Sequence, residues 1–331
     1  MITIKRIASD LKLDISTVSR ALRDDEKISE KTKKKVKEYA KKVGYIPNIF
    51  ASYLPKGKAS LISLIVPDLK HPYYSEIFTQ IEKKLGDKGY ILQLFTTSFN
   101  EKNFEKVIEK SLSLRVSGLI IAYHKIEDLD IPFVLIDQEK IDGYDKVSID
   151  NFYGAYEGVS YLINIGHKKI AYITDIYTTK EREYGYRKAL KDNGIEINEN
   201  LIIVRNGRCE EIGYNEGLRL LSMKIRPTAI FCGNDFVGIG VLKSAIKLNI
   251  KIPDQVSIIG FDDLPITSYL PIPLTTIRQP MEEISKFAID ILFKKMNNSE
   301  KKFPAKIIKP QLIIRDSTAP IYNNEKKYIR N

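Results

Sequence analysis

The sequence predicts an α/β protein in which a small N-terminal helical module precedes a large body built on two parallel sheets. Apolar residues recur at helical spacing through the first 45 residues. From Leu61 onward, short continuous apolar runs alternate with helical patterns, as in βαβ units. The charge is also uneven, because residues 1–58 hold 15 Lys and Arg against 7 Asp and Glu, whereas the rest of the chain holds 38 against 35. A basic module is therefore joined to a nearly neutral body.

Composition narrows the class of protein. The basic module is typical of a protein that binds a polyanion, although a chain this rich in lysine would also place lysines on solvated helices. No apolar run has the length of a signal peptide or of a membrane-spanning helix. The two cysteines, Cys209 and Cys232, form neither a disulfide framework nor a metal knuckle. These features predict a protein of the reducing cytoplasm.

Three short helices are expected before residue 46. The first has one apolar stripe and ends at a turn over Lys12–Leu13. The second is expected to take Asp14 as its N-cap and to bury Val18, Ala21 and Leu22. Ser29 is the expected N-cap of the third helix, which Gly44 stops. The other apolar stripe residues of the first and third helices are Ile4, Ile7, Ala8, Leu11, Val36, Tyr39, Ala40 and Val43. Two short helices, a tight turn and a third supporting helix predict a helix-turn-helix module.

The outward face of the second helix suits contact with DNA. Ser16 and Thr17 are short enough to allow close approach to a groove, and Arg20 can donate two hydrogen bonds to a guanine edge. Ile15 lies at the helix start, where an apolar side chain can pack on a thymine methyl. Taken alone, these small polar residues would also suit an ordinary solvated helix.

The motifs of this module resemble the DNA-binding headpiece of the LacI/GalR family of transcriptional regulators. The segments that carry the likeness are TIKRIASDLKLDISTVSRAL and ISEKTKKKVKEYAKKVGYIPN. The resemblance implies a headpiece over residues 1–46 and a hinge helix and linker over 47–59. It also implies a hinge leucine that enters the minor groove, which Leu54 matches. The candidate DNA-binding residues are Thr3, Ile15, Ser16, Thr17, Ser19, Arg20, Asn48, Ala51 and Leu54.

The hinge segment departs from the family pattern at two positions. Ser52 stands where the family often has Arg, and Pro55 stands where it often has Lys or Arg. These changes weaken the expected backbone contacts, for which Lys56 and Lys58 are possible substitutes. An ordinary linker before a domain boundary is the alternative interpretation, since a seven-residue helix is not stable alone.

The body resembles the two-lobed, periplasmic-binding-protein-like body of the same family. Its expected range is 60–319, with lobe 1 near 60–150 and 280–309 and lobe 2 near 151–279 and 310–319. By this likeness the chain crosses between lobes near Asp150, Gln279 and Lys309. Residues 320–331 are polar and charged, and we expect a flexible tail there.

Polar and aromatic residues follow the predicted strands, where ligands of open α/β sheets bind. Tyr73 and Tyr74 match the two aromatics of the family pattern, whose usual Asn is replaced here by His71. Tyrosine rings stack on sugar faces, and carboxylates, amides and an arginine contact vicinal hydroxyls. A neutral or a phosphorylated sugar would fit such a site. The candidate effector-binding residues are Tyr73, Tyr74, Asp137, Arg182, Asn234 and Asp262.

Some of these positions have plainer interpretations. Asp235 is the residue we expect to cap the helix that follows it, and Asp263 suits a turn. Arg182 lies between Glu181 and Glu183, so a surface ion pair is its alternative role. His167, in NIGHKKI, fits a structural role at a helix-to-strand turn.

The predicted function is that of a sequence-specific DNA-binding regulator of transcription, a repressor controlled by a sugar-like effector. A two-fold dimer on a roughly palindromic operator is expected, with a higher oligomer as the alternative and with no metal, cofactor or membrane partner. No phosphate-binding loop, zinc motif or nucleophile elbow occurs, so we expect no enzyme activity and name no catalytic residue. A solute-binding protein and a cytosolic α/β enzyme on a similar scaffold are the alternatives.

Overall fold

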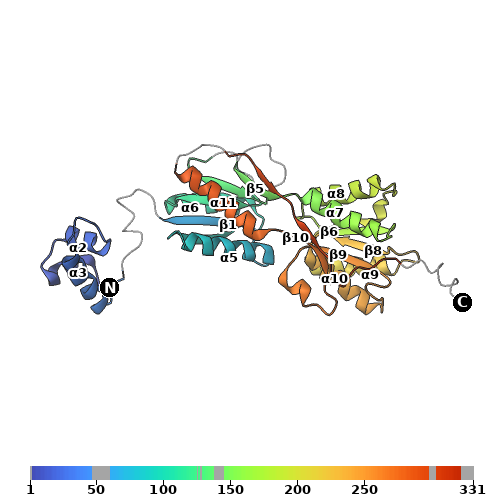
Figure 1. Ribbon diagram of the computed structural model, residues 1–331, viewed down its shortest axis with the longest axis horizontal. Coiled ribbons are helices and arrows are strands. Elements are labelled where there is room, and N and C mark those ends of the chain that lie inside the picture. The colour runs from blue at the N-terminus through green and yellow to red at the C-terminus, as the bar shows by residue number, and fades with distance from the viewer. Residues whose placement is uncertain are drawn as a thin grey trace. The chain divides into compact units, whose positions relative to one another are not determined.

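The structure is a computed structural model that describes residues 2–46, 60–124, 126, 129–137, 145–297 and 303–321. The chain divides into two compact units, Met1–Leu61 with Leu112–Ser117, and Ile62–Ser111 with Gly118–Asn331. The first contains the helical module and the second contains two α/β lobes (Figure 1).

The helical module consists of α1 (Ile4–Leu11), α2 (Ile15–Leu22) and α3 (Glu30–Lys42). Its small core is formed by Ile7, Ala8, Val18, Ala21, Val36 and Ala40. The turn after α1 is confirmed, because Lys12 has a left-handed φ of 53°. Ser29 caps α3 as predicted by accepting a bond from the Thr32 amide. Two details differ: Asp14 precedes α2 without a side-chain capping bond, and Leu22 is only half-buried.

The first lobe contains a six-stranded sheet whose strands lie in the order β11-β5-β4-β3-β1-β2. Every residue of the central strands β1 and β3 is buried, as their continuous apolar runs predicted. Helix α5 carries an apolar stripe of Ile77, Ile81 and Leu85, all fully buried. The elements are β1 (Leu61–Val66), α5 (Pro72–Gly86), β2 (Ile91–Thr96), α6 (Glu101–Ser113), β3 (Gly118–Ala122), β4 (Phe133–Ile136), β5 (Lys146–Ile149), α11 (Met281–Met296) and β11 (Lys306–Ile308).

The second lobe repeats this plan with the order β12-β10-β9-β8-β6-β7. Strands β6, β8 and β9 are neighbouring and parallel, so their carboxyl ends reach the same edge of the sheet. The elements are α7 (Asn151–Asn164), β6 (Ile170–Asp175), α8 (Lys180–Asp192), β7 (Ile202–Arg205), α9 (Cys209–Leu221), β8 (Ala229–Cys232), α10 (Asp235–Lys247), β9 (Ser257–Asp262), β10 (Thr275–Arg278) and β12 (Gln311–Ile313), with short 3-10 turns η2 (Glu199–Leu201) and η3 (Pro265–Ser268).

The chain passes between the two sheets three times. It leaves the first sheet after β5, returns after β10, and leaves again between β11 and β12. In Figure 1 these connections run between the lobes beside the label of β10. Each lobe is therefore assembled from segments far apart in sequence.

The described residues form twelve strands, and two features differ from the sequence-based expectation. The second sheet is not purely parallel, since β12 runs antiparallel to β10. The expected tail starts too early, because the Ile321 amide donates to the Ile165 carbonyl at 3.0 Å. The rest of that segment lies outside the described residues.

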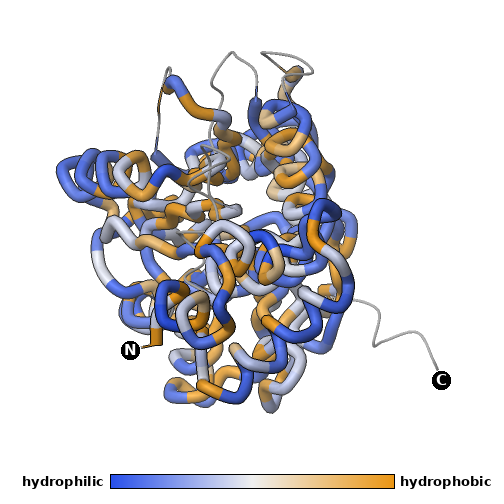
Figure 2. Tube along the Cα trace, turned by 90° about the vertical axis from the view of Figure 1, so that its left-hand side faces the viewer, coloured by the Kyte–Doolittle hydropathy of each residue, from blue (hydrophilic) through white to orange (hydrophobic). Residues whose placement is uncertain are grey.

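Helices cover both sheets with one apolar face each. Many of the helical turns in Figure 2 alternate between hydrophobic and hydrophilic colouring within a single turn, which is the pattern of a half-buried helix. Helices α9 and α10 approach so closely that a Cβ on Gly213 would lie 2.1 Å from the Val237 carbonyl oxygen. A side chain in place of Gly213 would therefore force the two helices apart. In the part of the chain that the structure describes, no helix is long and apolar enough to cross a membrane.

Candidate functional site

The α2 helix presents the side chains that were predicted to reach DNA. Val18 and Ala21 are fully buried beneath it, whereas Ser16 and Arg20 are exposed and Thr17 and Ser19 are half-buried. Ile15 is 50% exposed at the helix start, which is costly for an isoleucine unless something covers it. The helix therefore combines a buried inner face with an outer face of short polar groups and the exposed guanidinium of Arg20.

The other candidates for DNA contact lie outside α2. Thr3 is the N-cap of α1, where its hydroxyl accepts a bond from the Arg6 amide. Asn48, Ala51 and Leu54 lie outside the described residues. On α3, the pairs Lys33–Glu30 and Lys37–Asp24 neutralise two of its lysines, and further lysines of this helix are exposed.

Tyr73, Tyr74 and Asp137 form the first lobe's share of a site between the lobes. Both tyrosines lie in the first turn of α5, nearly buried, with ring centroids 5.0 Å apart in an edge contact. The Tyr74 hydroxyl donates to the Asp137 carboxylate at 3.3 Å. Asp137 follows β4 with a left-handed φ of 53°. Removal from water raises the pKa of Asp137, although the charge of Arg182 acts in the opposite direction.

Arg182, in the first turn of α8, is the second lobe's main cation. It is 7% exposed, and its guanidinium lies 3.6 Å from the centre of the Phe261 ring. Its Nε donates to Asn151 Oδ1 at 2.8 Å, and its Nη1 donates to the Gly233 carbonyl at 2.6 Å. Of the two glutamates that flank it, Glu183 pairs with Arg187, and Arg182 itself pairs with the buried Asp262.

Asp262, the last residue of β9, lies opposite Arg182. Its Oδ1 accepts a 2.6 Å bond from Gln279 Nε2 and lies 3.5 Å from Arg182 Nη1. The residue is 4% exposed and has a φ of 120°, a conformation rare outside glycine. Burial raises the pKa of Asp262, and the nearby charges of Arg182 and His71 offset only part of that rise.

Asn234, rather than Asp235, caps helix α10. Its Oδ1 accepts from the Val237 amide at 3.0 Å, and its Nδ2 donates to Asp175 at 2.9 Å. Asp235 is fully buried instead and accepts bonds from the Leu264 amide and the Thr276 hydroxyl. Our expectation for Asp235 was therefore wrong, because the asparagine one residue earlier already occupies the cap. Asp263 has the expected turn conformation, with a φ of 56°, and pairs with Arg278 and Arg315.

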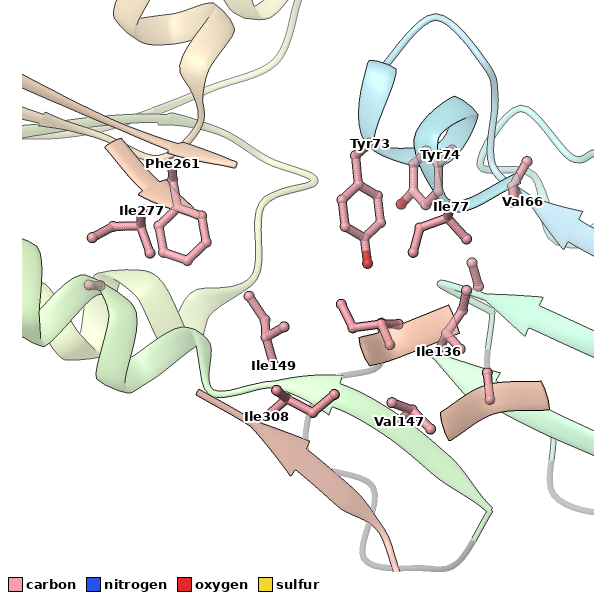
Figure 3. Close-up of a cluster of buried hydrophobic side chains, with 14 of the residues drawn as sticks. Val66, Tyr73, Tyr74, Ile77, Ile136, Val147, Ile149, Phe261, Ile277 and Ile308 are labelled. Carbon is pink, nitrogen blue, oxygen red and sulfur yellow. The ribbon is translucent and has the colours of Figure 1, made fainter. Parts of the chain in front are cut away.

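His71 joins the two halves of this site. Its Nδ1 accepts the Tyr73 amide at 3.3 Å, so the proton of the neutral ring lies on Nε2, which is 3.6 Å from Asp262 Oδ2. The ring also meets Phe236 of the second lobe edge-on, at 5.5 Å between centroids. Figure 3 shows Tyr73 extending from α5 with its hydroxyl in the space between Phe261 and Ile136. We call the six candidates Tyr73, Tyr74, Asp137, Arg182, Asn234 and Asp262 the interlobe site.

Four polar residues at this site were not singled out in the sequence. Asp175 ends β6 and could have been found by the same strand-end argument, because it accepts from Asn234 and from the Thr178 hydroxyl. His71 was noted only as a departure from a motif. Asn151 gave no signal, and Gln279 was noted only as a crossing point between the lobes, since the partners of both lie on other elements of the chain. Within the described ranges no group of three or more His, Cys, Asp or Glu side chains could hold a metal ion.

His167 occupies the structural position predicted for it, well away from these residues in the fold of the second lobe. It lies between α7 and β6, buried, with ring nitrogens bonded to the hydroxyls of Thr228 and Ser257. Burial lowers the pKa of His167 below its ordinary value, and the Ala319 carbonyl acts weakly against that shift.

Both units of the chain are similar to known protein families. The family described as bacterial regulatory proteins, lacI family, matches residues 3–48, and the periplasmic binding protein-like domain matches residues 159–318. The HTH-type transcriptional regulator DegA of Bacillus subtilis is 32% identical, with 96% of this chain and 98% of that protein covered. The HTH-type transcriptional repressor CytR of Escherichia coli is 30% identical, with 96% of each chain covered.

Solved structures share the same architecture. The lac repressor dimer bound to operator and the anti-inducer ONPF has a TM-score of 0.87 at 23% identity, covering 96% of this chain and 99% of that one. A LacI family transcriptional regulator from Enterococcus faecium with bound ribose has a TM-score of 0.69 at 26% identity, covering 79% and 100%.

Proposed function

The chain belongs to the LacI family of bacterial regulatory proteins and is a DNA-binding transcriptional regulator, and we propose that it is a repressor controlled by a small sugar-like effector. The single observation that supports an effector site is the meeting of polar groups from both lobes. Tyr73 and Asp137 come from one lobe, and Arg182 and Asp262 come from the other. A ligand that bridges these groups stabilises the closed arrangement of the lobes.

The residue composition of this site favours a sugar or a sugar-like molecule. The Tyr73 and Tyr74 rings offer faces for the C–H surface of a sugar ring. The Asp137 and Asp262 carboxylates accept bonds from hydroxyls, and Arg182 Nη2, which bonds to none of the described residues, is a donor left for a ligand. The relative from Enterococcus faecium, which binds ribose, supports the same class of ligand.

We assign residues 1–46 to the DNA-binding headpiece, 47–59 to a hinge helix and linker, and 60–319 to an effector-binding and dimerisation body. Lobe 1 would hold 60–150 and 280–309, and lobe 2 would hold 151–279 and 310–319, in line with the strands of each sheet. As a regulator of bacterial genes, the protein would act in the cytoplasm.

The DNA contacts follow from the helix-turn-helix geometry. We place α2 in the major groove, with Ile15, Ser16 and Arg20 toward the base edges and Thr17 and Ser19 toward the groove walls. Thr3 would contact the backbone, and Asn48, Ala51 and Leu54 would act in the hinge, with Leu54 as a wedge in the minor groove. A homodimer would read two half-sites of a roughly palindromic operator.

Effector and operator would be coupled through the hinge. A change in lobe closure moves the first lobes of a dimer relative to each other, and this changes whether the two hinge segments can pair on DNA. Operator and effector must then change each other's affinity by the same factor. The sign of the coupling distinguishes an inducer from a co-repressor.

Two measurements test this function. Purified protein would be used to select duplexes from a random DNA pool, and an enriched palindrome is the expected result. Thermal shift against a panel of pentoses, hexoses and their phosphates would then locate the effector, because a ligand that binds the folded state raises its apparent stability. Absence of any enriched sequence would contradict operator binding, and a flat response to the whole panel would contradict the sugar class.

A further inference from the structure

The polar groups of the interlobe site are short of donors and rich in negative charge. We infer that the site selects a neutral, hydroxyl-rich sugar and excludes the corresponding sugar phosphates, an inference that rests on the proposed effector function. The likeness to other regulators leaves this choice open, and the charges and hydrogen bonds of this chain decide it.

The charge balance is the first argument. Asp137 and Asp262 act on each other through space, and Asp175 adds a third carboxylate that acts on Asp262. Against them stand one permanent cation, Arg182, and His71, whose neutral form directs an N–H toward Asp262. In both Asp137 and Asp262 burial raises the pKa in spite of Arg182. The described residues therefore leave an excess of negative charge that a dianionic phosphate would increase.

The hydrogen-bond balance points the same way. Gln279 is 5% exposed, and its Oε1 accepts no hydrogen bond from the described residues, while its Nε2 is bound to Asp262. An acceptor buried in this way needs a donor, and the carboxylates beside it need donors as well. Sugar hydroxyls supply such donors, whereas an ionised phosphate group supplies only acceptors.

Arg182 is the group that a phosphate would need, and most of its donors are already used. Its Nε and Nη1 are bound to Asn151 and to the Gly233 carbonyl, and its flat face lies on Phe261. Bidentate recognition of a phosphate requires two adjacent N–H groups in one plane. Among the described residues, Nη2 alone makes no bond, and its two N–H groups can serve sugar oxygens. The N–H groups of Nε and Nη1 that would complete a bidentate clamp with Nη2 are already bound.

The test compares each neutral sugar with its own phosphate. Calorimetric titration of the full chain would use ribose with ribose 5-phosphate, and glucose, galactose and fructose with their 6-phosphates. We expect at least one neutral sugar to bind and its phosphate to bind at least tenfold more weakly. Equal or tighter binding of the phosphate would overturn this inference and leave the effector function standing. Binding of neither member of any pair would refute the proposed sugar function itself.

A charge-removing variant makes the test specific to the site. Asn tolerates the left-handed φ of Asp137 and can still accept the Tyr74 hydroxyl, so Asp137→Asn removes one negative charge with little change in shape. We expect the preference for the neutral sugar over its phosphate to shrink roughly tenfold in this variant. The matched control is Asp290→Asn, an exposed aspartate on α11, which should keep the parent's ratio. An unchanged ratio in Asp137→Asn would contradict electrostatic exclusion, as would an equal change in the control.

Discussion

Replacing Asp262 by asparagine separates a ligand-binding role from a structural one. Asparagine is a better probe than alanine, because the φ of 120° at this position would strain alanine more. Its side-chain oxygen can keep the 2.6 Å bond from Gln279 Nε2. The variant therefore removes the negative charge opposite Arg182 while it preserves the local backbone and one hydrogen bond.

The expected cost to folding is small. Two unit charges 3.5 Å apart attract by about 5 kcal/mol at an effective dielectric constant of about 20. Burial nevertheless raises the pKa of Asp262, so the loss of hydration outweighs this attraction. Arg182 also keeps its bonds to Asn151 and Gly233 and its contact with Phe261. We expect the free energy of unfolding to change by about 1 kcal/mol or less, instead of the roughly 3–5 kcal/mol typical of breaking an isolated buried pair.

The expected cost to effector binding is larger. A hydrogen bond to a charged acceptor contributes about 1.5–3 kcal/mol, so the effector Kd should rise roughly 10- to 100-fold. Calorimetry with the sugar that binds the parent gives this Kd, and a melting curve should shift by no more than about 4 °C. Operator binding without sugar should stay as in the parent. An effector Kd equal to the parent's would refute a role of Asp262 in binding the effector. A large fall in Tm together with loss of operator binding would show that Asp262 stabilises the fold instead.

Three further predictions concern the headpiece and the core. Deleting residues 1–59 should leave a folded, sugar-binding body without operator affinity. For the intact chain, the logarithm of the operator association constant should fall with the logarithm of the salt concentration, at a slope of about −0.9 per phosphate neutralised. Operator binding by the truncated protein, or an affinity independent of salt in anisotropy titrations, would contradict the headpiece assignment. Arg20→Ala should cost about 1–3 kcal/mol on the operator and relax preference at one base pair per half-site, whereas a loss spread evenly over all sequences would make Arg20 a phosphate contact. Burial lowers the pKa of His167, so the unfolded chain binds a proton at this residue more readily than the folded chain does. The stability that the neutral ring contributes is therefore fully present above pH 6.5, the ordinary pKa of histidine, and is lost as the pH falls below that value. Urea unfolding at pH 7.5 and 5.5 should therefore show a steeper loss in the parent than in His167→Gln, and equal losses would count against this linkage.

The sequence predicted the strands that are buried on both faces and missed the polar ones. Continuous apolar runs such as those of β1 and β9 can only be satisfied between two layers, so their positions were clear from composition. Strand β10 has the sequence TTIR, yet Thr275 and Thr276 are fully buried. Their hydroxyls are satisfied by the Arg315 carbonyl and by Asp235, which lie about 40 residues away in sequence. Such partners are invisible until the chain is folded.

The site was predictable to the extent that it follows from strand ends. Asp137 and Asp262 were found because each follows or ends a strong apolar run. The distinction between Asn234 and Asp235 was not predictable, since both residue types cap helices and only the backbone geometry selects one. Gln279 gave no signal because its importance comes from a bond to Asp262 on a neighbouring strand.

We propose that a sugar bound between the lobes controls the affinity of this protein for its operator. The most direct test measures the Kd of the full chain for its selected operator across sugar concentrations, and the Kd for the sugar with and without saturating operator. Both Kd values should change by the same factor, of about 5- to 150-fold. An operator Kd that is independent of a sugar shown to bind the chain would contradict control of operator binding by the sugar.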